Sequence, residues 1–230
     1  MNLLELDSAP LDAAAQMATD EALLALAPAE PCLRIYCWAM EAVPCATFGY
    51  GQHYADVQRT LPPDLRDRCV RRPTGGGIVI HDTDLTFSLV IPRDLLPAAP
   101  ADIYQVLHAA IAAALAQVVP LRLAPSAAHP TPAPGLASQC FREPVPADLL
   151  ASDGQKVLGG ALRRTRSHIL YQGSLRLPDA RTTLLPDCST ALRSALLRLL
   201  RLTASLSAPA PIPPPALLAR YRSPLWQARR

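Results

Sequence analysis

The sequence predicts an α+β protein in which helices pack on a mixed, largely antiparallel sheet. Residues 32–38, CLRIYCW, alternate apolar and polar side chains in the way a half-buried strand does. Residues 102–118 instead place apolar side chains at helical spacing, from Ile103 through Leu107 to Ile111. The chain contains no internal repeat. Strand and helix patterns therefore occur together in one chain.

The elements of the first half follow from similar patterns. Residues 10–27, PLDAAAQMATDEALLALA, predict an opening helix whose inner face carries alanine, leucine and methionine. The strand at 32–38 comes next, and VPCATFGYGQ predicts another strand that runs into a glycine-containing turn. Residues 75–92 predict two strands joined by the polar sequence HDTD. The helix at 102–118 completes this half.

The second half begins with a proline-rich segment at 124–135, which we expect to be a loop. Asp153 and Gly154 lie between two apolar runs and predict a hairpin. Residues 167–177 predict a strand. Residues 190–202 predict an amphipathic helix with leucines facing inward and arginines facing outward.

Length and composition limit the class of protein. For 230 residues we expect one domain over 1–204, followed by a proline-rich connector and a C-terminal tail over 205–230. The chain is 50% hydrophobic and 18% charged, which is typical of a globular protein. A net charge of +3 is too small to indicate nucleic acid as the main partner, and no apolar run is long enough to span a bilayer. We therefore expect neither nucleic acid nor a membrane as partner.

Cysteine usage and the N-terminus indicate a compartment. The six cysteines form no CxxC pair and no metal-ligand spacing, so we expect no metal site. The N-terminus lacks the basic segment and apolar core of a signal peptide. We therefore expect a cytoplasmic protein whose cysteines are free thiols.

One lysine stands out among the basic residues. The chain carries 22 lysines and arginines, and Lys156 is the single lysine among them. A compact ammonium can act as a point charge against a developing negative oxygen, whereas a guanidinium is a wide planar fork. Composition alone leaves two explanations open, which are chance and a role that arginine cannot fill.

The strongest local signal is RRPTGGGIVIHD, residues 71–82. Glycine permits a positive φ and lets a ligand approach the backbone closely. The segment matches neither the P-loop pattern nor the dinucleotide-binding fingerprint. A glycine-rich turn beside surface arginines would explain it without any function. The residues concerned are Arg71, Arg72, Gly75, Gly76 and Gly77.

Two further groups could carry chemistry. His81 and Asp82 could form an acid–base pair, although His-Asp at the end of a strand is more often a turn. Cys140 lies in SQCFREP, ahead of the hairpin that bears Lys156. A nearby cation lowers the pKa of a thiol and makes it a better nucleophile at neutral pH. The alternative for Cys140 is a small buried residue without reactivity.

Taken in order, these segments resemble the lipoate-protein ligase and octanoyltransferase family, whose catalytic fold is similar to that of class II synthetases and biotin ligases. The match runs over residues 17–177, and the ordered set is more specific than any one piece. Its members are MATDEALL at 17–24; Arg34, Tyr36 and Trp38; Gly49 and Gln52; RRPTGGGIVIHD at 71–82; GQKVLGGALRR at 154–164; and Gln172, Gly173 and Ser174.

The resemblance implies roles for these residues. Lys156 would be the essential lysine of the family, holding the acyl carbonyl or a phosphate while charge develops on oxygen. The glycine loop would line a tunnel for a fatty or lipoyl chain, with one or both arginines steadying its rim. Residues 1–204 would then be the acyl-transfer catalytic domain. We expect the substrate-binding residues to be Arg71, Arg72, Gly75, Gly76, Gly77, His81, Asp82, Gly159, Gly160 and Ala161.

The resemblance leaves two chemistries open. A transferase takes an octanoyl group from acyl carrier protein onto a cysteine and needs no cofactor, and CFREP, with Cys140, resembles the cysteine segment of one such branch. A ligase activates a free acid with ATP and Mg²⁺, and the GGG run is the ligase-like form. Either enzyme would modify a lysine of a lipoyl carrier, such as a glycine-cleavage H protein or a dehydrogenase E2 domain. We favour the transferase, with Lys156 and Cys140 as catalytic residues, over the ligase, a biotin ligase and a non-catalytic carrier-binding module.

Overall fold

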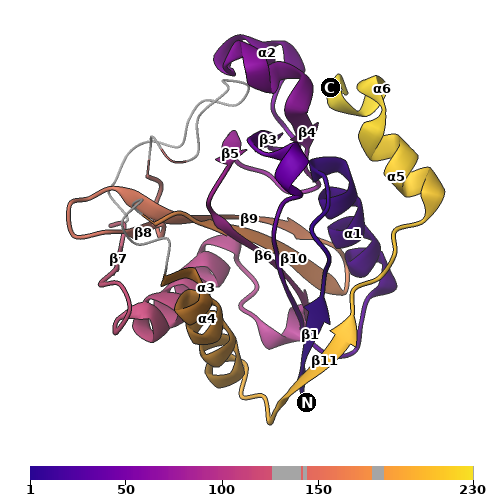
Figure 1. The fold of residues 1–230 in the computed structure, drawn as a ribbon. Helices are drawn as coiled ribbons and strands as arrows, with labels where there is room; N and C mark the ends of the chain where they lie inside the picture. The colour runs from indigo at the N-terminus through magenta and orange to yellow at the C-terminus, as the bar shows by residue number, and fades with distance from the viewer. Residues whose placement is uncertain (126–140, 142–143, 178–183, 230) are drawn as a thin grey trace.

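The computed structural model is built around an eight-stranded sheet with the order β11-β1-β2-β6-β10-β9-β8-β7 (Figure 1). The structure describes residues 1–125, 141, 144–177 and 184–229. β1 pairs in parallel with β2 and β11, and the other neighbouring strands of this sheet pair antiparallel. This confirms the predicted mixed, largely antiparallel sheet. The strands are β1 (Leu3–Asp7), β2 (Cys32–Tyr36), β6 (Leu85–Pro92), β7 (Arg122–Leu123), β8 (Leu149–Leu150), β9 (Lys156–Arg164), β10 (His168–Leu175) and β11 (Ser205–Pro209).

A smaller sheet of three strands, in the order β4-β3-β5, lies beside the large one (Figure 1). Its strands are β3 (Cys45–Phe48), β4 (Cys69–Arg71) and β5 (Val79–His81). β3 pairs in parallel with β4 and antiparallel with β5. The HDTD segment therefore carries the chain from β5 of the small sheet into β6 of the large one.

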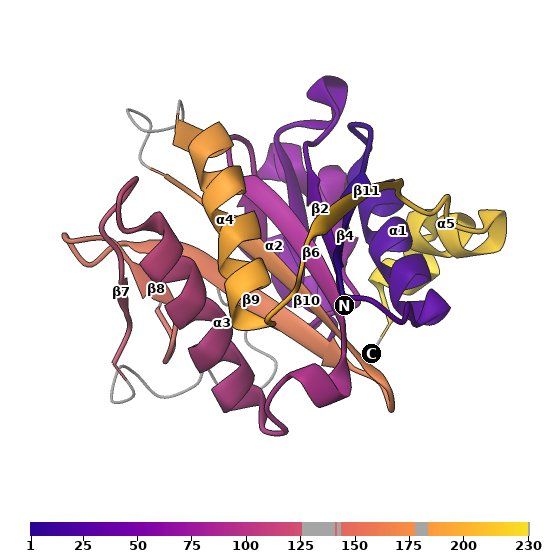
Figure 2. The same cartoon turned by 90° about the horizontal axis from the view of Figure 1, so that it is seen from below.

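Helices cover both faces of the large sheet. α3 (Pro100–Leu115) and α4 (Leu185–Leu199) lie side by side on one face, and α1 (Ala13–Leu26) lies on the other side of the molecule (Figure 2). Alternate side chains of a strand point to opposite faces, and β6 shows this directly. Leu89 packs in the core beneath α3 and α4, whereas Val90 packs beneath α1.

The predicted helices at 10–27 and 102–118 are confirmed as α1 and α3. α1 begins where Asp12 caps it, because the Asp12 carboxylate accepts a hydrogen bond of 2.8 Å from the Ala15 N–H. The predicted hairpin at Asp153 and Gly154 joins β8 to β9, and Gly154 has a φ of +86°. The predicted helix at 190–202 begins earlier, at residue 185.

The C-terminal residues add a strand and two helices. Residues 205–209, which the sequence analysis assigned to a connector and tail, form β11 and pair with β1. α5 (Pro215–Arg222) then packs against α1, and α6 (Pro224–Gln227) packs against β4 (Figure 1). The division of the chain at residue 204 stays a prediction.

The remaining short elements are α2 (Tyr54–Thr60) and three 3₁₀ turns at Met40–Ala42, Pro63–Arg68 and Arg93–Leu95. Within the described residues, no helix has the length and apolar character needed to cross a membrane.

Candidate active site

A narrow slot of about 40 Å³ lies between the two sheets. It brings together six of the predicted substrate-binding residues, which come from the glycine loop, β5 and β9. Further walls come from α1, β2, β3, β6 and β10. The lining residues are Met17, Tyr36, Thr47, Arg72, Gly76, Val79, His81, Thr86, Gly159, Gly160, Ala161, Gln172, Gly173 and Ser174.

Two glycines of the slot are required by the backbone and by the packing beneath it. Gly76 has a φ of +87°, a conformation that side chains with a Cβ rarely adopt. Gly160 lies directly over the ring of Tyr171, and a Cβ at this position would overlap the Tyr171 hydroxyl. Gly76 therefore lets the loop turn, and Gly160 leaves room for the Tyr171 ring.

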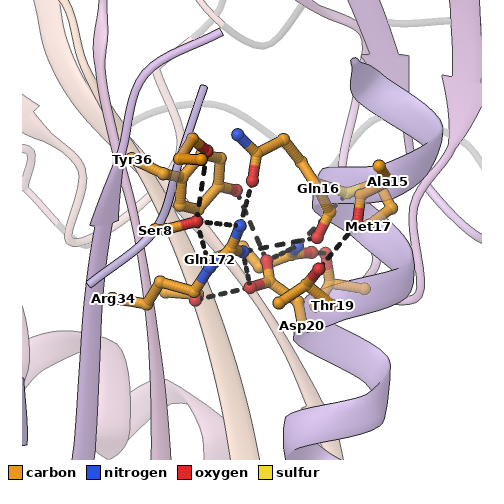
Figure 3. Close-up of polar contacts among 12 residues, drawn as sticks. Ser8, Ala15, Gln16, Met17, Thr19, Asp20, Arg34, Tyr36 and Gln172 are labelled. Carbon is orange, nitrogen blue, oxygen red and sulfur yellow. Dashed lines mark hydrogen bonds and ion pairs between the residues drawn. The ribbon is translucent and has the colours of Figure 1, made fainter. Parts of the chain in front are cut away.

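A buried polar network joins α1, β2 and β10 (Figure 3), and a hydrogen bond from Thr74 extends it to the glycine loop. The Asp20 carboxylate accepts hydrogen bonds from Arg34 Nη1 at 2.6 Å and from Gln172 Nε2 at 2.6 Å. The side-chain amide oxygen of Gln172 in turn accepts a hydrogen bond of 2.6 Å from the hydroxyl of Thr74, which lies in the glycine loop. The Arg34 and Asp20 side chains are both fully buried. Segments that are far apart in the sequence thus hold one wall of the slot.

The two arginines ahead of the glycine loop have different positions. The Arg72 guanidinium donates to the carbonyl of Gly75 and braces the loop from within. Arg71 lies among the backbone of the C-terminal segment instead, and is absent from the slot lining. Its guanidinium donates to the carbonyls of Tyr50, Gln52, Trp226, Gln227 and Arg229.

His81 is paired with Asp84 rather than with its sequence neighbour Asp82. His81 Nδ1 lies 2.9 Å from Asp84 Oδ2, and His81 Nε2 lies 2.9 Å from the Thr47 hydroxyl. Burial alone would raise the pKa of Asp84. His81 and the hydroxyls of Ser174 and Thr86 outweigh burial, so the pKa of Asp84 is lowered. His81 is thus held in one orientation at the wall of the slot.

Asp82 lies outside the slot. It accepts a hydrogen bond of 2.7 Å from Arg176, and both side chains are partly exposed. Asp82 and Arg176 line a surface hollow that also includes Lys156. The two halves of the predicted His81–Asp82 pair therefore belong to different places.

Lys156 lines an open hollow of about 640 Å³ next to the slot. Its Nζ lies 2.7 Å from Asp148 Oδ2, and the two side chains are 3% and 4% exposed. The ring centre of Phe141 lies 5.8 Å from the same Nζ. Burial raises the pKa of Asp148, while the Lys156 ammonium and the Val145 N–H counteract that rise. A buried ammonium with a carboxylate partner can stay charged where an isolated one would lose its proton.

The hollow and the slot share two strands. Ile78 and Ile80 line the hollow, whereas Val79 and His81 line the slot, because alternate residues of the β5 segment face opposite ways. Along β9, Lys156 lines the hollow, and the glycines a few residues further on line the slot. The hollow and the slot therefore lie on opposite faces of the β5 segment and are connected along β9.

Two carboxylates of this region were not identified from the sequence. Asp148 comes just before β8, and its pairing with Lys156 depends on the β8–β9 hairpin, so extending the predicted hairpin backwards would have indicated it. Asp84 lies three residues after His81, and only the turn between the sheets brings them together.

Two of the predicted substrate-binding glycines do not line the slot. Gly75 and Gly77 lie in the glycine loop but are absent from the slot lining.

The proposed nucleophile, Cys140, lies outside the described residues. The described cysteines are free thiols. Burial raises the pKa of Cys32 and Cys69 to about 11, and that of Cys45 to about 12, which makes these three poor nucleophiles at neutral pH. Within the part of the chain that the structure describes, no group of three or more His, Cys, Asp or Glu side chains could hold a metal ion.

The fold is that of lipoate-protein ligases. The T. acidophilum protein Ta0514 with bound lipoic acid superposes with a TM-score of 0.75 at 18% identity, covering 99% of each chain. Lipoate-protein ligase A bound with ATP superposes with a TM-score of 0.72 at 18% identity, again covering 99% of each chain. Identities this low establish the shared fold and nothing finer.

Sequence comparison establishes the family. Residues 12–182 match the lipoyl protein ligase A/B catalytic domain, and the chain belongs to that family. It is 34% identical over 179 residues to the octanoyltransferase LipM of Oceanobacillus iheyensis, covering 75% of this chain and 63% of the relative. It is 34% identical over 214 residues to the octanoyltransferase LipM of Symbiobacterium thermophilum, covering 90% of this chain and 70% of the relative. The chain thus spans about two thirds of the length of these relatives, and the resemblance seen in the sequence is confirmed.

Proposed function

We propose that the chain is an octanoyltransferase, which moves an octanoyl group from acyl carrier protein to a lysine of a lipoyl carrier domain. The observation that carries the proposal is the placement of Lys156, in a buried ion pair on β9, the strand whose glycines line the slot. The relatives named octanoyltransferase LipM favour transfer over ATP-dependent ligation. The acceptor would be a glycine-cleavage H protein or a dehydrogenase E2 domain.

The proposed reaction has two acyl transfers. The Cys140 thiol loses its proton, its thiolate attacks the carbonyl of the octanoyl thioester, and the carbon–sulfur bond to the carrier protein breaks. The carrier thiolate that leaves takes up the proton that the Cys140 thiol gave up. The acceptor lysine then attacks the Cys140 thioester, an amide forms, and the cysteine thiol is released. Both steps pass through a negatively charged oxygen, which the Lys156 ammonium would stabilise. No cofactor takes part in either transfer.

Each part of the described site has a task in this proposal. The octanoyl chain would enter the slot between glycine backbone and the apolar side chains of Met17 and Val79, and the slot must widen from its volume of about 40 Å³ to hold the whole chain. Arg72 and the network around Asp20 keep the glycine loop in place. Asp148 keeps the buried Lys156 charged.

An acceptor assay tests the proposal. A purified lipoyl domain is incubated with the chain and octanoyl-acyl carrier protein without ATP, and its mass is followed. The proposal predicts octanoylation under these conditions and none with free octanoate. Modification that requires free acid and ATP would instead identify a ligase, the alternative that the GGG run favours. A lipoyl domain that binds but stays unmodified in both mixtures would identify a non-catalytic carrier-binding module.

A further inference from the structure

A buried histidine lies next to the Lys156–Asp148 pair and is not among the predicted site residues. His108, in α3, is 1% exposed. Its Nδ1 lies 2.6 Å from the Ala147 carbonyl oxygen, and its Nε2 lies 2.6 Å from the Tyr171 hydroxyl. A carbonyl oxygen can only accept a hydrogen bond, so Nδ1 carries the proton and donates.

The second nitrogen of this histidine is an acceptor. Burial lowers the pKa of His108 to about 4, so the ring is neutral at physiological pH and carries one proton. Because Nδ1 has that proton, Nε2 accepts a hydrogen bond from the Tyr171 hydroxyl. The ring is thus fixed between β10 and the backbone that leads into β8.

The carbonyl that His108 binds belongs to the peptide group between Ala147 and Asp148. Ala147 has a φ of +70°, in the left-handed region that a residue with a Cβ adopts only at a cost in free energy. The N–H of the same peptide donates to the Val145 carbonyl at 3.0 Å. The Asp148 side chain accepts a hydrogen bond of 2.7 Å from the Val145 N–H and pairs with Lys156 at 2.7 Å.

We propose that His108 is a positioning residue, which holds the Ala147–Asp148 peptide so that the Asp148 carboxylate meets the Lys156 ammonium. The hydrogen bond from Nδ1 stabilises a peptide orientation that Ala147 disfavours on its own. Without this bond we expect the peptide to be held less firmly and the Asp148 carboxylate to move away from the Lys156 ammonium. The effect on acyl transfer rests on the proposed function, whereas the effect on the ion pair does not.

Two substitutions separate the hydrogen bonds of His108. His108→Asn keeps a donor at the position of Nδ1, because the Asn amide nitrogen is attached at Cγ as Nδ1 is. His108→Gln places its amide one bond further out, where it replaces Nε2 toward Tyr171 and leaves Ala147 unsupported. His168→Gln is the matched control, because His168 is also a buried histidine that bonds a backbone carbonyl, that of Pro28.

The state of the ion pair can be read directly, because Lys156 is the single lysine of the chain. An amine-reactive reagent modifies only the neutral amine, and mass spectrometry of peptides separates Lys156 from the N-terminus. A lysine that loses its carboxylate partner while still buried releases its proton more readily. We expect Lys156 to react about tenfold faster in His108→Gln, and within about twofold of the unchanged protein in His108→Asn and His168→Gln.

Kinetics supply the second measurement. We expect His108→Gln to lower kcat about tenfold with little change in KM for the carrier, because misplaced catalytic groups slow the chemical step. His108→Asn should restore most of the rate. A protein without any octanoyltransferase activity would refute the proposed function and leave the labelling comparison intact.

Three results would overturn the positioning role. One is equal labelling of Lys156 in a folded His108→Gln variant and in the unchanged protein. Another is equally fast labelling in His108→Asn and His108→Gln. If His108→Gln does not fold, ¹⁵N NMR of the histidines in the unchanged protein decides. The proposal requires a proton on Nδ1 of His108, and a proton on Nε2 alone would refute it.

Discussion

Lys156 and Asp148 form a buried ion pair at the centre of the site, 2.7 Å apart. Removing one partner of such a pair leaves a buried charge without compensation, which is more costly than losing an exposed ion pair. The geometry also limits the shape of the cation. An ammonium fits beside one carboxylate oxygen, whereas a guanidinium would need room for a planar fork.

The first prediction concerns the shape of the cation at position 156. We expect Lys156→Arg to lower kcat of octanoyl transfer by about 10²-fold or more, because the charge is kept but displaced. Steady-state kinetics with an octanoyl-carrier donor measure it. Arg59→Lys, at an exposed arginine on α2, is the control and should keep full activity. A Lys156→Arg variant with an unchanged rate would show that shape does not matter here.

The second prediction concerns His108 and acid. Burial lowers its pKa from 6.5 to about 4, so the unfolded chain binds a proton that the folded chain does not between these values. Its contribution to stability is therefore complete above pH 6.5 and is lost as the pH falls toward 4. Lowering the pH from 7 to 5 should therefore reduce the unfolding free energy by about 2 kcal/mol through the titration of His108.

Urea unfolding of the unchanged protein and of His108→Asn at the two pH values measures this cost. The unchanged protein should lose about 2 kcal/mol more than the variant, because asparagine does not titrate. Equal losses in the two proteins would mean that His108 is not held neutral by burial.

Elements differ in how far their sequences predict them. α1 and α3 are long and periodic, and their positions were predicted closely. β11 was not predicted, because its serine- and proline-containing segment has no strand pattern of its own. It lies at the edge of the sheet, paired with β1 alone, where proline is tolerated.

The candidate active site also contains residues that the sequence alone does not identify. The glycines and Lys156 could be singled out because unusual residue types mark them in the sequence. Asp84 and His108 could not, because their roles depend on a turn and on a helix packed against β10. Asp148 could have been indicated only by extending the predicted hairpin backwards. Either Arg71 or Arg72, or both, was expected at the rim of the tunnel, because nothing local distinguishes two adjacent arginines with different surroundings.

The third prediction concerns the packing of β9 on β10. We expect Gly160→Ala to lower the unfolding free energy by about 1–3 kcal/mol, because the new Cβ overlaps the Tyr171 hydroxyl. Chemical denaturation measures the change. Gly51→Ala is the control, because a Cβ at Gly51 meets nothing within 4 Å. A Gly160→Ala protein as stable as the control would contradict the close packing of the two strands.

At the scale of the whole molecule, the C-terminal part of the chain packs against the N-terminal part. β11 pairs with β1, so residues near the two ends lie side by side in the sheet (Figure 1). The last helices then return to Arg71, which precedes the glycine loop. Trp226 is 5% exposed, and its ring N–H donates to the Arg71 carbonyl at 3.0 Å. The C-terminal segment thereby supports the backbone that leads into the slot.

The fourth prediction tests this support. We expect Trp226→Ala to lower the unfolding free energy by about 3–5 kcal/mol, because a buried aromatic ring and its hydrogen bond are lost. Leu225→Ala is the neighbouring control, because Leu225 is 84% exposed. Thermal unfolding of both variants compares them. If Trp226→Ala unfolds at the temperature of Leu225→Ala, the segment is not part of the folded core.

The central claim is the proposed passage of an octanoyl group through Cys140. The most direct measurement is the intact mass of the chain after incubation with octanoyl-acyl carrier protein, without ATP and without acceptor. The account predicts a mass increase of one octanoyl group, which hydroxylamine removes and which Cys140→Ser abolishes. An unchanged mass, in a protein that modifies a lipoyl domain only with free acid and ATP, would contradict it.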